Sequence, residues 1–338
     1  MAHYRNILII KPGAIGDLLQ MTPVIRALKL MMPEARITIL VASTVSVDLF
    51  RYNDDVSACI VYDKRGEHQT LPMFWQLWRR IRVGCFDLVL NYQRSNLKAW
   101  LLAAATFPSR VLVYHKPKNR VVHAVMNHLE TVAPLGIDPA AADHRLKLIV
   151  GAEADAYADE LFRSHGFADQ KVIALNPGAN HPVNRWDPLN FARLADRLPA
   201  EFGAKVIIIG GKEDIALAEE IGRSAVSSPV SLAGRTSLLE LGAILKRCSL
   251  LVTGDTGPMH MATAVNTRVI ALFGAADPAR TGPVGEGHRV MQAEGVDCLP
   301  CRSRRCARSP YLECMEKITV DAVVREVASM LREEEGRS

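Results

Sequence analysis

Short apolar runs alternate along the chain with longer stretches of helical periodicity. A continuous apolar run bounded by turn residues is typical of a strand that is buried on both faces, as in a parallel sheet. Strands that alternate with helices predict βα units and therefore a doubly wound α/β fold. The runs form two series, at residues 7–10, 37–41, 59–62, 87–90 and 110–114, and at 172–175, 206–209, 230–232, 250–252 and 269–272.

The two series of runs predict two domains. At 338 residues the chain exceeds the size at which a single hydrophobic core stops growing. The stretch 151–169, which is rich in Ala, Asp and Glu and has a helical pattern, lies between the two series. We therefore predict a Rossmann-like domain at 1–155, a second one at 170–318, and a C-terminal helix at 319–338.

The most informative stretch is the run 250–252 and the sequence Thr-Gly-Asp-Thr-Gly-Pro-Met-His that follows it. It predicts a buried strand, a turn at 254–257, and a helix with proline in its first turn. Such a turn presents backbone N–H groups and the positive end of a helix dipole, an arrangement that suits phosphate. Asp255 and His260 are near enough to reach the same crevice. The alternative is that Asp255 and Thr256 only cap the helix.

A second candidate turn follows the first apolar run. Residues 11–17 read Lys-Pro-Gly-Ala-Ile-Gly-Asp, and a helical pattern runs over 18–28. Because doubly wound folds bind ligands beyond the carboxyl ends of their strands, we expect Asp17 at the mouth of the crevice. The alternative is that Asp17 is a simple helix N-cap. The glycines of this loop do not form G-x-G-x-x-G, which counts against an NAD-dependent oxidoreductase.

Other runs of the second series also end in residues that suit a nucleotide. The run 172–175 is followed by Asn-Pro-Gly-Ala-Asn, whose small residues allow close approach of a ligand. Arg185 lies a few residues further on and could clamp a diphosphate. Glu213 follows the run 206–209, where a ribose could sit. Unrelated caps would rarely align in this way, so we favour a nucleotide site.

Composition limits the location and the partners. Apolar residues make up 49% of the chain and charged residues 23%, as in soluble globular proteins. No apolar run approaches the length of a spanning helix, and no secretory h-region follows the N-terminus, so we expect a cytoplasmic protein. The net charge of +5 is compatible with an anionic substrate or membrane surface and does not indicate nucleic acid.

Two basic stretches of the first domain have alternative explanations. Residues 71–82 combine aromatic and basic side chains in a helical pattern. They predict a core-facing helix with a solvated basic face, or a helix on a membrane surface. Residues 115–128 indicate a solvated face or a patch for acceptor phosphates. Their histidines lack the spacing of a metal site, so we predict no zinc there.

Four cysteines lie close together toward the end of the chain. Their C-x2-C-x4-C-x7-C spacing lacks the paired C-x2-C units of a zinc ribbon, and seven cysteines do not indicate a secreted disulfide framework. We interpret them as a structural cluster, reduced or clipped by a metal ion or a disulfide, in preference to an iron–sulfur site. The four are Cys298, Cys301, Cys306 and Cys314.

Taken together, five motifs resemble those of glycosyltransferase family 9, the lipopolysaccharide heptosyltransferases. Each motif is weak alone, but five in this order are specific. The resemblance covers nearly the whole chain and implies the GT-B architecture, in which two Rossmann-like domains face a cleft. It also implies that the C-terminal helix packs back toward the N-terminal domain. The motifs lie at 11–17, 176–179, 232–238, 254–260 and 272–274.

The resemblance implies an inverting glycosyltransferase that moves a heptose from ADP-L-glycero-D-manno-heptose to the lipopolysaccharide inner core. By position, Asp17 matches the base that deprotonates the acceptor hydroxyl while ADP leaves. We predict Lys11, Gly16 and Arg94 on the acceptor or phosphate side. The implied donor-binding residues are Ala179, Asn180, Arg185, Glu213 at the ribose, Thr236 at the adenine edge, Asp255, Thr256, Gly257 and His260.

No metal and no cofactor beyond the donor is implied, because helix N-termini and cations can offset the charge of the leaving diphosphate. The implied partners are a nucleotide sugar, a lipopolysaccharide core or lipid A acceptor, and the inner-membrane surface. The enzyme would be peripheral at the cytoplasmic face of that membrane. Nucleic acid is not expected.

One position departs from the family pattern. The family commonly has Lys-Arg-Trp or Lys-x-Trp where residues 184–186 read Asn-Arg-Trp. We hypothesise that Arg185 takes over the diphosphate contact of the missing lysine. The alternatives are a family 9 transferase with another nucleotide sugar or another glycan acceptor, and a nucleotide-sugar-binding protein without turnover. The presence of Asp17 argues against the last of these.

Overall fold

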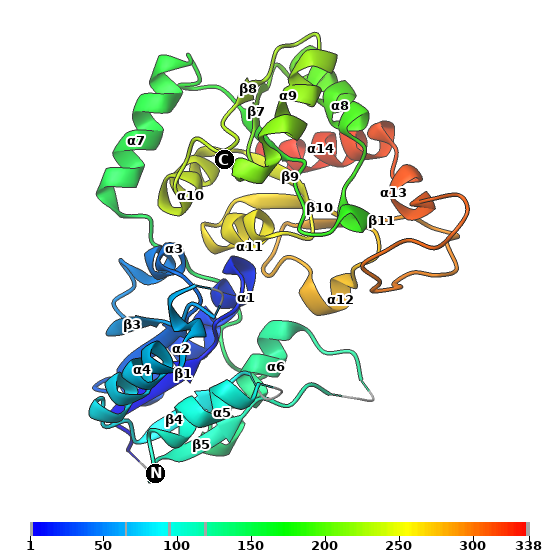
Figure 1. The fold of residues 1–338 in the computed structure, drawn as a ribbon. Coiled ribbons are helices and arrows are strands. Elements are labelled where there is room, and N and C mark those ends of the chain that lie inside the picture. Colours follow the sequence, from blue (N-terminus) through cyan, green and yellow to red (C-terminus); the bar gives the residue numbers. More distant parts are fainter. Residues whose placement is uncertain (1–2, 65, 94–95, 118–119, 336–338) are drawn as a thin grey trace. The chain divides into compact units, whose positions relative to one another are not determined.

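The computed structural model describes residues 3–64, 66–93, 96–117 and 120–335. The chain divides into two compact units, Met1–Ile149 (unit 1) and Val150–Ser338 (unit 2). Each unit contains one parallel sheet flanked by helices, as Figure 1 shows. The predicted α/β class with two doubly wound sheets is confirmed.

Unit 1 has a five-stranded sheet in the order β3-β2-β1-β4-β5, with all strands parallel. Residues 7–10 of β1 are fully buried, because helices cover both faces of the strand. The strand order reverses between β1 and β4, so the ligand crevice of such a sheet is expected at their carboxyl ends. The strands are β1 (Asn6–Ile10), β2 (Arg36–Val41), β3 (Ala58–Val61), β4 (Leu88–Asn91) and β5 (Arg110–Val113).

The helical pattern over 18–28 forms two helices, not the single one predicted. The first ends at Leu19, and the second begins at Thr22 with Pro23 in its first turn, where a missing N–H is tolerated. The Thr22 hydroxyl donates to Leu19 O at 2.7 Å across the break. The helices of unit 1 are α1 (Ile15–Leu19), α2 (Thr22–Met31), α3 (Thr44–Val47), α4 (Leu71–Val83), α5 (Leu97–Ala104) and α6 (Ala124–Glu130), with 3-10 turns η1 (Asp48–Phe50), η2 (Glu67–Gln69) and η3 (Ala133–Leu135).

Unit 2 has a six-stranded parallel sheet in the order β11-β10-β9-β6-β7-β8. The order reverses between β6 and β9, and Asn176 pairs with Thr253 at their carboxyl ends. Strand β11 was not predicted, because its four residues include only two apolar ones. The strands are β6 (Val172–Asn176), β7 (Lys205–Ile208), β8 (Val230–Ser231), β9 (Leu250–Gly254), β10 (Arg268–Phe273) and β11 (Arg289–Gln292).

Helices cover the sheet of unit 2 on both faces. They are α7 (Gly151–Ser164), α8 (Pro188–Phe202), α9 (Ile215–Ser224), α10 (Leu238–Arg247), α11 (Gly257–Ala264), α12 (Pro278–Thr281), α13 (Glu313–Glu316) and α14 (Val320–Glu335), with η4 (Pro182–Asn184) and η5 (Lys212–Asp214). Among the residues that the structure describes, no helix combines the length and the apolar character required to cross a membrane.

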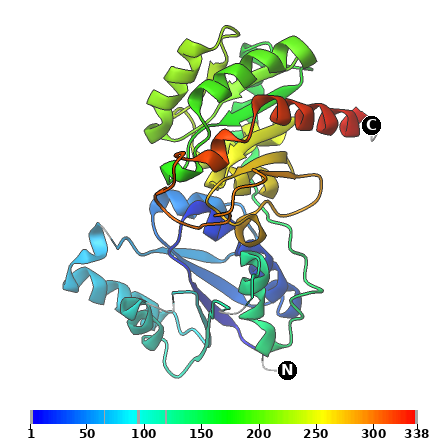
Figure 2. The same cartoon turned by 90° about the vertical axis from the view of Figure 1, so that its right-hand side faces the viewer.

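Both ends of unit 2 are helices that pack within this unit. The stretch predicted to separate the domains contains α7, which packs on α10 inside unit 2, where Arg247 donates to Asp155 Oδ1 at 2.9 Å. The C-terminal helix α14 was expected to pack toward the N-terminal domain. Its fully buried Val323, Val327 and Met330 belong to the core of unit 2, against α8 and β10 (Figure 2), and the expected packing toward the N-terminal domain stays a prediction.

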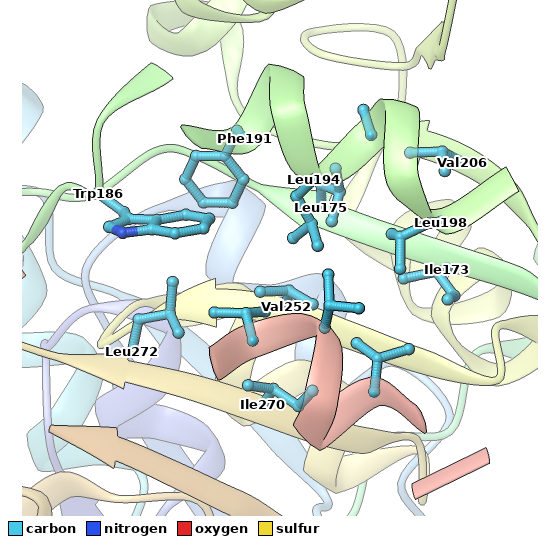
Figure 3. Packing of buried hydrophobic residues seen from close by; sticks show 14 of the residues in the cluster. Ile173, Leu175, Trp186, Phe191, Leu194, Leu198, Val206, Val252, Ile270 and Leu272 are labelled. Carbon is cyan, nitrogen blue, oxygen red and sulfur yellow. The ribbon is translucent and has the colours of Figure 1, made fainter. Parts of the chain in front are cut away.

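A large apolar cluster fixes the segment that follows β6. Trp186 is 2% exposed and packs edge-on against Phe191 at a ring distance of 5.0 Å. Its indole N–H donates to Ile318 O at 2.8 Å, so the ring is held at both its apolar and its polar end. Figure 3 shows Trp186 over Leu272 and beside Phe191. The chain just before Trp186 is therefore anchored against the sheet.

Candidate functional site

The turn between β9 and α11 forms as predicted. Helix α11 begins at Gly257 with Thr256 as its N-cap residue, but the Thr256 side chain makes no capping hydrogen bond. Its Oγ1 instead accepts a hydrogen bond from Asn176 Nδ2 at 3.0 Å. Asp255 accepts a hydrogen bond from the Thr281 hydroxyl at 3.1 Å. Thr256 therefore occupies the N-cap position without capping through its side chain, and that side chain does not cover the first N–H groups of α11.

Asn176 holds this turn from the neighbouring strand. It is 2% exposed, and its Nδ2 group donates to Thr253 Oγ1 at 2.8 Å as well as to Thr256. The two threonine hydroxyls lie 3.1 Å apart. This buried network joins the carboxyl ends of β6 and β9 at the point where the strand order reverses. Asn176 belongs to the motif at 176–179, but its role could not be predicted, because its partners lie about 80 positions away in the sequence.

At Gly254 the end of β9 passes close to the backbone of η4. A Cβ atom at this position would lie 2.8 Å from the carbonyl oxygen of Asn184 in η4. Real Cβ atoms do not approach backbone oxygens so closely, so only glycine fits here. Asn184 lies where the resemblance implies a lysine, and its buried Oδ1 has no hydrogen-bond partner among the described residues. The structure shows how its backbone packs, but it does not explain the substitution.

Arg185 clamps the loop that follows β6. Its Nε and Nη2 groups donate to Ala179 O at 3.2 and 3.0 Å. Two donors of a planar guanidinium on one carbonyl give the loop a defined position beside η4. Ala179 and Arg185, predicted together as donor contacts, therefore lie together. The hypothesis that Arg185 also contacts a diphosphate stays a prediction.

Asp214 is a residue that the sequence reasoning missed. It is 8% exposed, and its Oδ2 atom accepts a hydrogen bond from the Gly211 N–H at 2.9 Å. A Cβ atom on Gly178 would lie 2.5 Å from the Asp214 carboxylate, so the loop after β6 passes directly against it. Asp214 thus joins the loops after β6 and β7. The Gly-Gly pair that ends three positions before Asp214 could have indicated it. We predicted the neighbouring Glu213 as the ribose contact instead, and its side chain is exposed.

The remaining donor-side residues lie at the same edge of the sheet. Each follows the carboxyl end of a parallel strand, which is where ligands of such sheets bind. Thr236 is half-buried and directly precedes Ser237, which caps α10. His260 is 5% exposed in the first turn of α11. The predicted residues follow β6 (Ala179, Asn180, Arg185), β7 (Glu213), β8 (Thr236) and β9 (Asp255, Thr256, Gly257, His260).

In unit 1, Asp17 lies in the first turn of α1, whose N-cap residue is Ala14, so the N-cap alternative for Asp17 is wrong. Lys11 Nζ lies 3.2 Å from Asp17 Oδ1 in an ion pair. The Asp17 side chain is 48% exposed and that of Lys11 only 10%. The carboxylate is thus oriented by a buried cation while it stays accessible to a ligand. Gly16 is buried beside it, and Arg94 lies outside the described residues.

The buried His128 of α6 contacts the Lys11 ammonium group. Its Nε2 atom lies 3.5 Å from Lys11 Nζ and its Nδ1 atom 3.3 Å from Gln20 O. Since a carbonyl oxygen only accepts, Nδ1 carries the proton and Nε2 accepts from the ammonium group. Burial lowers the pKa of His128 to about 3, and the Lys11 charge acts in the same direction. His128 is therefore neutral at physiological pH. From the sequence, His128 was predicted only as part of the basic stretch 115–128, and its contact with Lys11 was not predicted.

The basic stretch 115–128 lines a hollow of about 810 Å³ on unit 1. His115, Lys116 and Arg120 contribute to its wall, and Arg120 donates to Glu130 at 2.7 Å. His123 accepts the Val125 N–H at 3.3 Å and so caps α6. One of the predicted cations is therefore paired, and the acceptor-phosphate interpretation stays a prediction.

The four clustered cysteines are free thiols in this structure. Burial raises the pKa of Cys314, and the three neighbouring cysteines add to the effect. The backbone N–H groups of Leu312 and Arg308 lower the pKa of Cys306. Within the described ranges, no three His, Cys, Asp or Glu side chains are arranged to hold a metal ion. The interpretation of these cysteines as a structural cluster, reduced or clipped by a metal ion or a disulfide, stays a prediction.

The fold and these sites together define a class of protein. Two doubly wound parallel sheets are the architecture of GT-B glycosyltransferases, and solved structures share it. The glycosyltransferase family 9 structure from Veillonella parvula DSM 2008 superposes with a TM-score of 0.85 at 23% identity, over 98% of this chain and 99% of that one. Escherichia coli ADP-heptose LPS heptosyltransferase II superposes with a TM-score of 0.77 at 22% identity, over 98% and 99%.

Comparison with a family profile identifies the family. Residues 74–312 match the profile of glycosyltransferase family 9 (heptosyltransferase), and the chain belongs to this family. The chain is also 28% identical to lipopolysaccharide heptosyltransferase 3 of Escherichia coli over 330 residues. This alignment covers 91% of this chain and 95% of that protein.

Proposed function

We propose that this protein is an inverting heptosyltransferase that moves a heptose from ADP-L-glycero-D-manno-heptose to the inner core of lipopolysaccharide. Membership of family 9 supports the class of reaction, and the names of the similar proteins support heptose and lipopolysaccharide as substrates. The observation that supports donor binding in unit 2 is that the Thr256 side chain does not cap the N-terminus of α11.

The donor diphosphate binds at this helix start in unit 2. The N–H groups after Thr256 and the positive end of the α11 dipole stabilise its charge. That charge grows as the glycosidic C–O bond breaks and ADP leaves with the electron pair, so donors fixed in advance by Asn176 lower the barrier. Backbone donors can supply this stabilisation without a cation, which is why we propose metal-independent transfer.

The acceptor hydroxyl is deprotonated by Asp17 in unit 1. Its carboxylate is half-exposed and oriented by Lys11 through Oδ1, so an incoming hydroxyl can reach Oδ2, the oxygen atom that the ion pair does not use. As the hydroxyl oxygen forms its bond to the anomeric carbon, its proton passes to Asp17. Attack on the face opposite the leaving ADP inverts the anomeric configuration. The acceptor is part of a membrane glycolipid, so the enzyme works at the cytoplasmic face of the inner membrane.

Calorimetric titration with ADP, UDP and GDP tests the donor assignment first. We expect selective ADP binding that is lost in Asp255→Ala, whose carboxylate orders the turn through Thr281. Preference for UDP or GDP would keep the fold and favour the second candidate, a family 9 transferase with another nucleotide sugar. No nucleotide binding would refute the proposal.

Turnover with ADP-heptose and purified core acceptor tests the base. We expect Asp17→Asn to lower kcat by about 10²–10⁴-fold, the usual contribution of a general base, with the Kd for ADP unchanged. The matched control is Asp54→Asn, an exposed carboxylate of the same unit. An Asp17→Asn enzyme with normal kcat would exclude Asp17 as the base, while the donor assignment would stand.

A further inference from the structure

Helix α4 buries one face and exposes aromatic and apolar residues on the other. Phe74, Leu77 and Ile81 are buried against the sheet of unit 1. On the outside, Leu71 is 74% exposed and Trp75 53%. Soluble proteins rarely leave such large side chains exposed in groups without a use for them.

Helix α5 continues this apolar face. The Trp78 indole of α4 donates to Leu101 O at 3.1 Å, and Arg82 donates to Ala105 O at 3.3 Å at the end of α5. The two helices therefore lie side by side on the same face of the sheet (Figure 1). We term six exposed apolar residues of these helices and of the turn after α5 the α4–α5 surface: Leu71, Trp75, Leu97, Trp100, Leu101 and Phe107.

The charged residues within these two helices have one sign. Helix α4 contains Arg79, Arg80 and Arg82, and α5 contains Lys98, while neither helix contains an acidic residue. Lys98 Nζ lies 5.8 Å from the centre of the Phe74 ring, so a cation is held directly beside the aromatic residues. An interface with another protein is usually depleted of charge at its core. A combination of tryptophan, leucine and arginine is typical of helices that lie in a membrane interface.

We propose that the α4–α5 surface docks onto a bilayer that contains anionic glycerophospholipids. The tryptophan and leucine side chains enter the boundary between headgroups and acyl chains, and the arginines and Lys98 bind the lipid phosphates. The helices lie flat on the bilayer, because their other face is already buried against the sheet. This docking concerns unit 1 alone and builds on the membrane location given in the proposed function. Because the vesicle assay below contains neither donor nor acceptor, its failure would not bear on the proposed transfer reaction.

Co-sedimentation of the full chain with vesicles tests this proposal. We expect binding to vesicles of phosphatidylcholine with about 30 mol % phosphatidylglycerol, weak binding to phosphatidylcholine alone, and weaker binding at high salt. Three of the four tryptophans lie in α4 and α5, so their fluorescence should shift to the blue on binding. Trp186, which is buried in unit 2, should not contribute.

Two double variants separate the apolar from the electrostatic contribution. Trp75→Ala with Leu97→Ala should weaken the partition coefficient more than tenfold on anionic vesicles. Arg79→Gln with Arg80→Gln should remove most of the preference for anionic lipid, at about fivefold per arginine. Leu30→Ala is the matched control, since Leu30 is 76% exposed on α2, outside the α4–α5 surface. All of the substituted side chains are exposed, and circular dichroism should show normal folding.

Several outcomes would overturn the proposal. They are a wild-type chain that ignores anionic lipid, double variants that bind like the wild type, and a Leu30→Ala variant that loses binding to the same extent. Light scattering supplies one more test. If the wild type self-associates without vesicles and Trp75→Ala abolishes this, the surface is an interface between copies of the chain and not a lipid surface.

Discussion

The buried amide of Asn176 should determine both the stability of unit 2 and its affinity for nucleotide. Asn176→Ala removes the hydrogen bonds to Thr253 Oγ1 and Thr256 Oγ1. Each such bond contributes about 1 kcal/mol net, and the two hydroxyls can still pair with each other, so we expect a loss of ~2 kcal/mol in the free energy of unfolding. For a unit of this size the loss corresponds to a fall of roughly 4–8 °C in Tm.

The same substitution should weaken ADP binding. Without Asn176 the Thr256 side chain keeps only its hydrogen bond to Thr253, so it can more readily rotate to cap α11, where it would compete with the diphosphate for backbone N–H groups. Competition worth about 1.4 kcal/mol raises the Kd for ADP tenfold. Thermal melts with and without ADP identify the transition of unit 2 as the one that ADP shifts. Calorimetry then gives the Kd.

Asn190→Ala is the matched control for Asn176→Ala. Asn190 lies on α8 and bonds only weakly, to an exposed arginine at 3.4 Å, so its loss should leave Tm and Kd near the wild-type values. The reasoning is refuted if Asn176→Ala matches this control in both measurements. A lower Tm with an unchanged Kd would show that the network supports the sheet but does not shape the phosphate turn.

Three further substitutions test other parts of the structure. His128 has a folded-state pKa below its unfolded value, so the unfolded chain binds the proton first and stability is lost as pH falls from about 6.5 toward 3, by up to ~1.4 kcal/mol per pH unit. His128→Gln should show a smaller fall in urea midpoint between pH 7 and pH 5, and an equal fall would contradict the assignment. Gly254→Ala should lose nucleotide binding and stability because the new methyl group meets Asn184 O, while Gly222→Ala, with no atom within 4 Å, should be neutral or stabilising in the same melts. Trp186→Phe leaves a buried carbonyl without its donor and should cost about 1–3 kcal/mol in urea denaturation, and an unchanged midpoint would show that water replaces the indole.

Local sequence predicted the strands and the edge of each sheet where residues of the sites lie. Apolar runs such as 7–10 and 250–252 are sufficient for this, because a strand buried on both faces has few alternatives. The turn at 254–257 was also predictable, since its glycines and proline impose backbone geometry within a few positions. In each case the information lies inside one element.

The support of these sites was not predictable in the same way. His128 contacts Lys11 across 117 positions, and Asn176 reaches Thr256 across 80. Such pairs depend on the strand order, which periodicity does not specify. The packing of α14 illustrates the same limit, because an apolar stripe predicts a helix and a buried face but does not identify the surface that covers it.

The network of Asn176, Thr253 and Thr256 also bears on how this scaffold can diversify. The turn at 254–257 is held by the ends of β6 and β9, and the loops that follow β7 and β8 are attached to other strands. On the proposed function, mutations in those loops other than at Asp214, which contacts the loop after β6, can therefore change which base or sugar is accepted without disturbing the turn that binds the diphosphate. A lineage built on this plan can exchange its donor by loop replacement, and chimeras that carry the loops of another family member should keep diphosphate affinity while they acquire a new nucleotide preference.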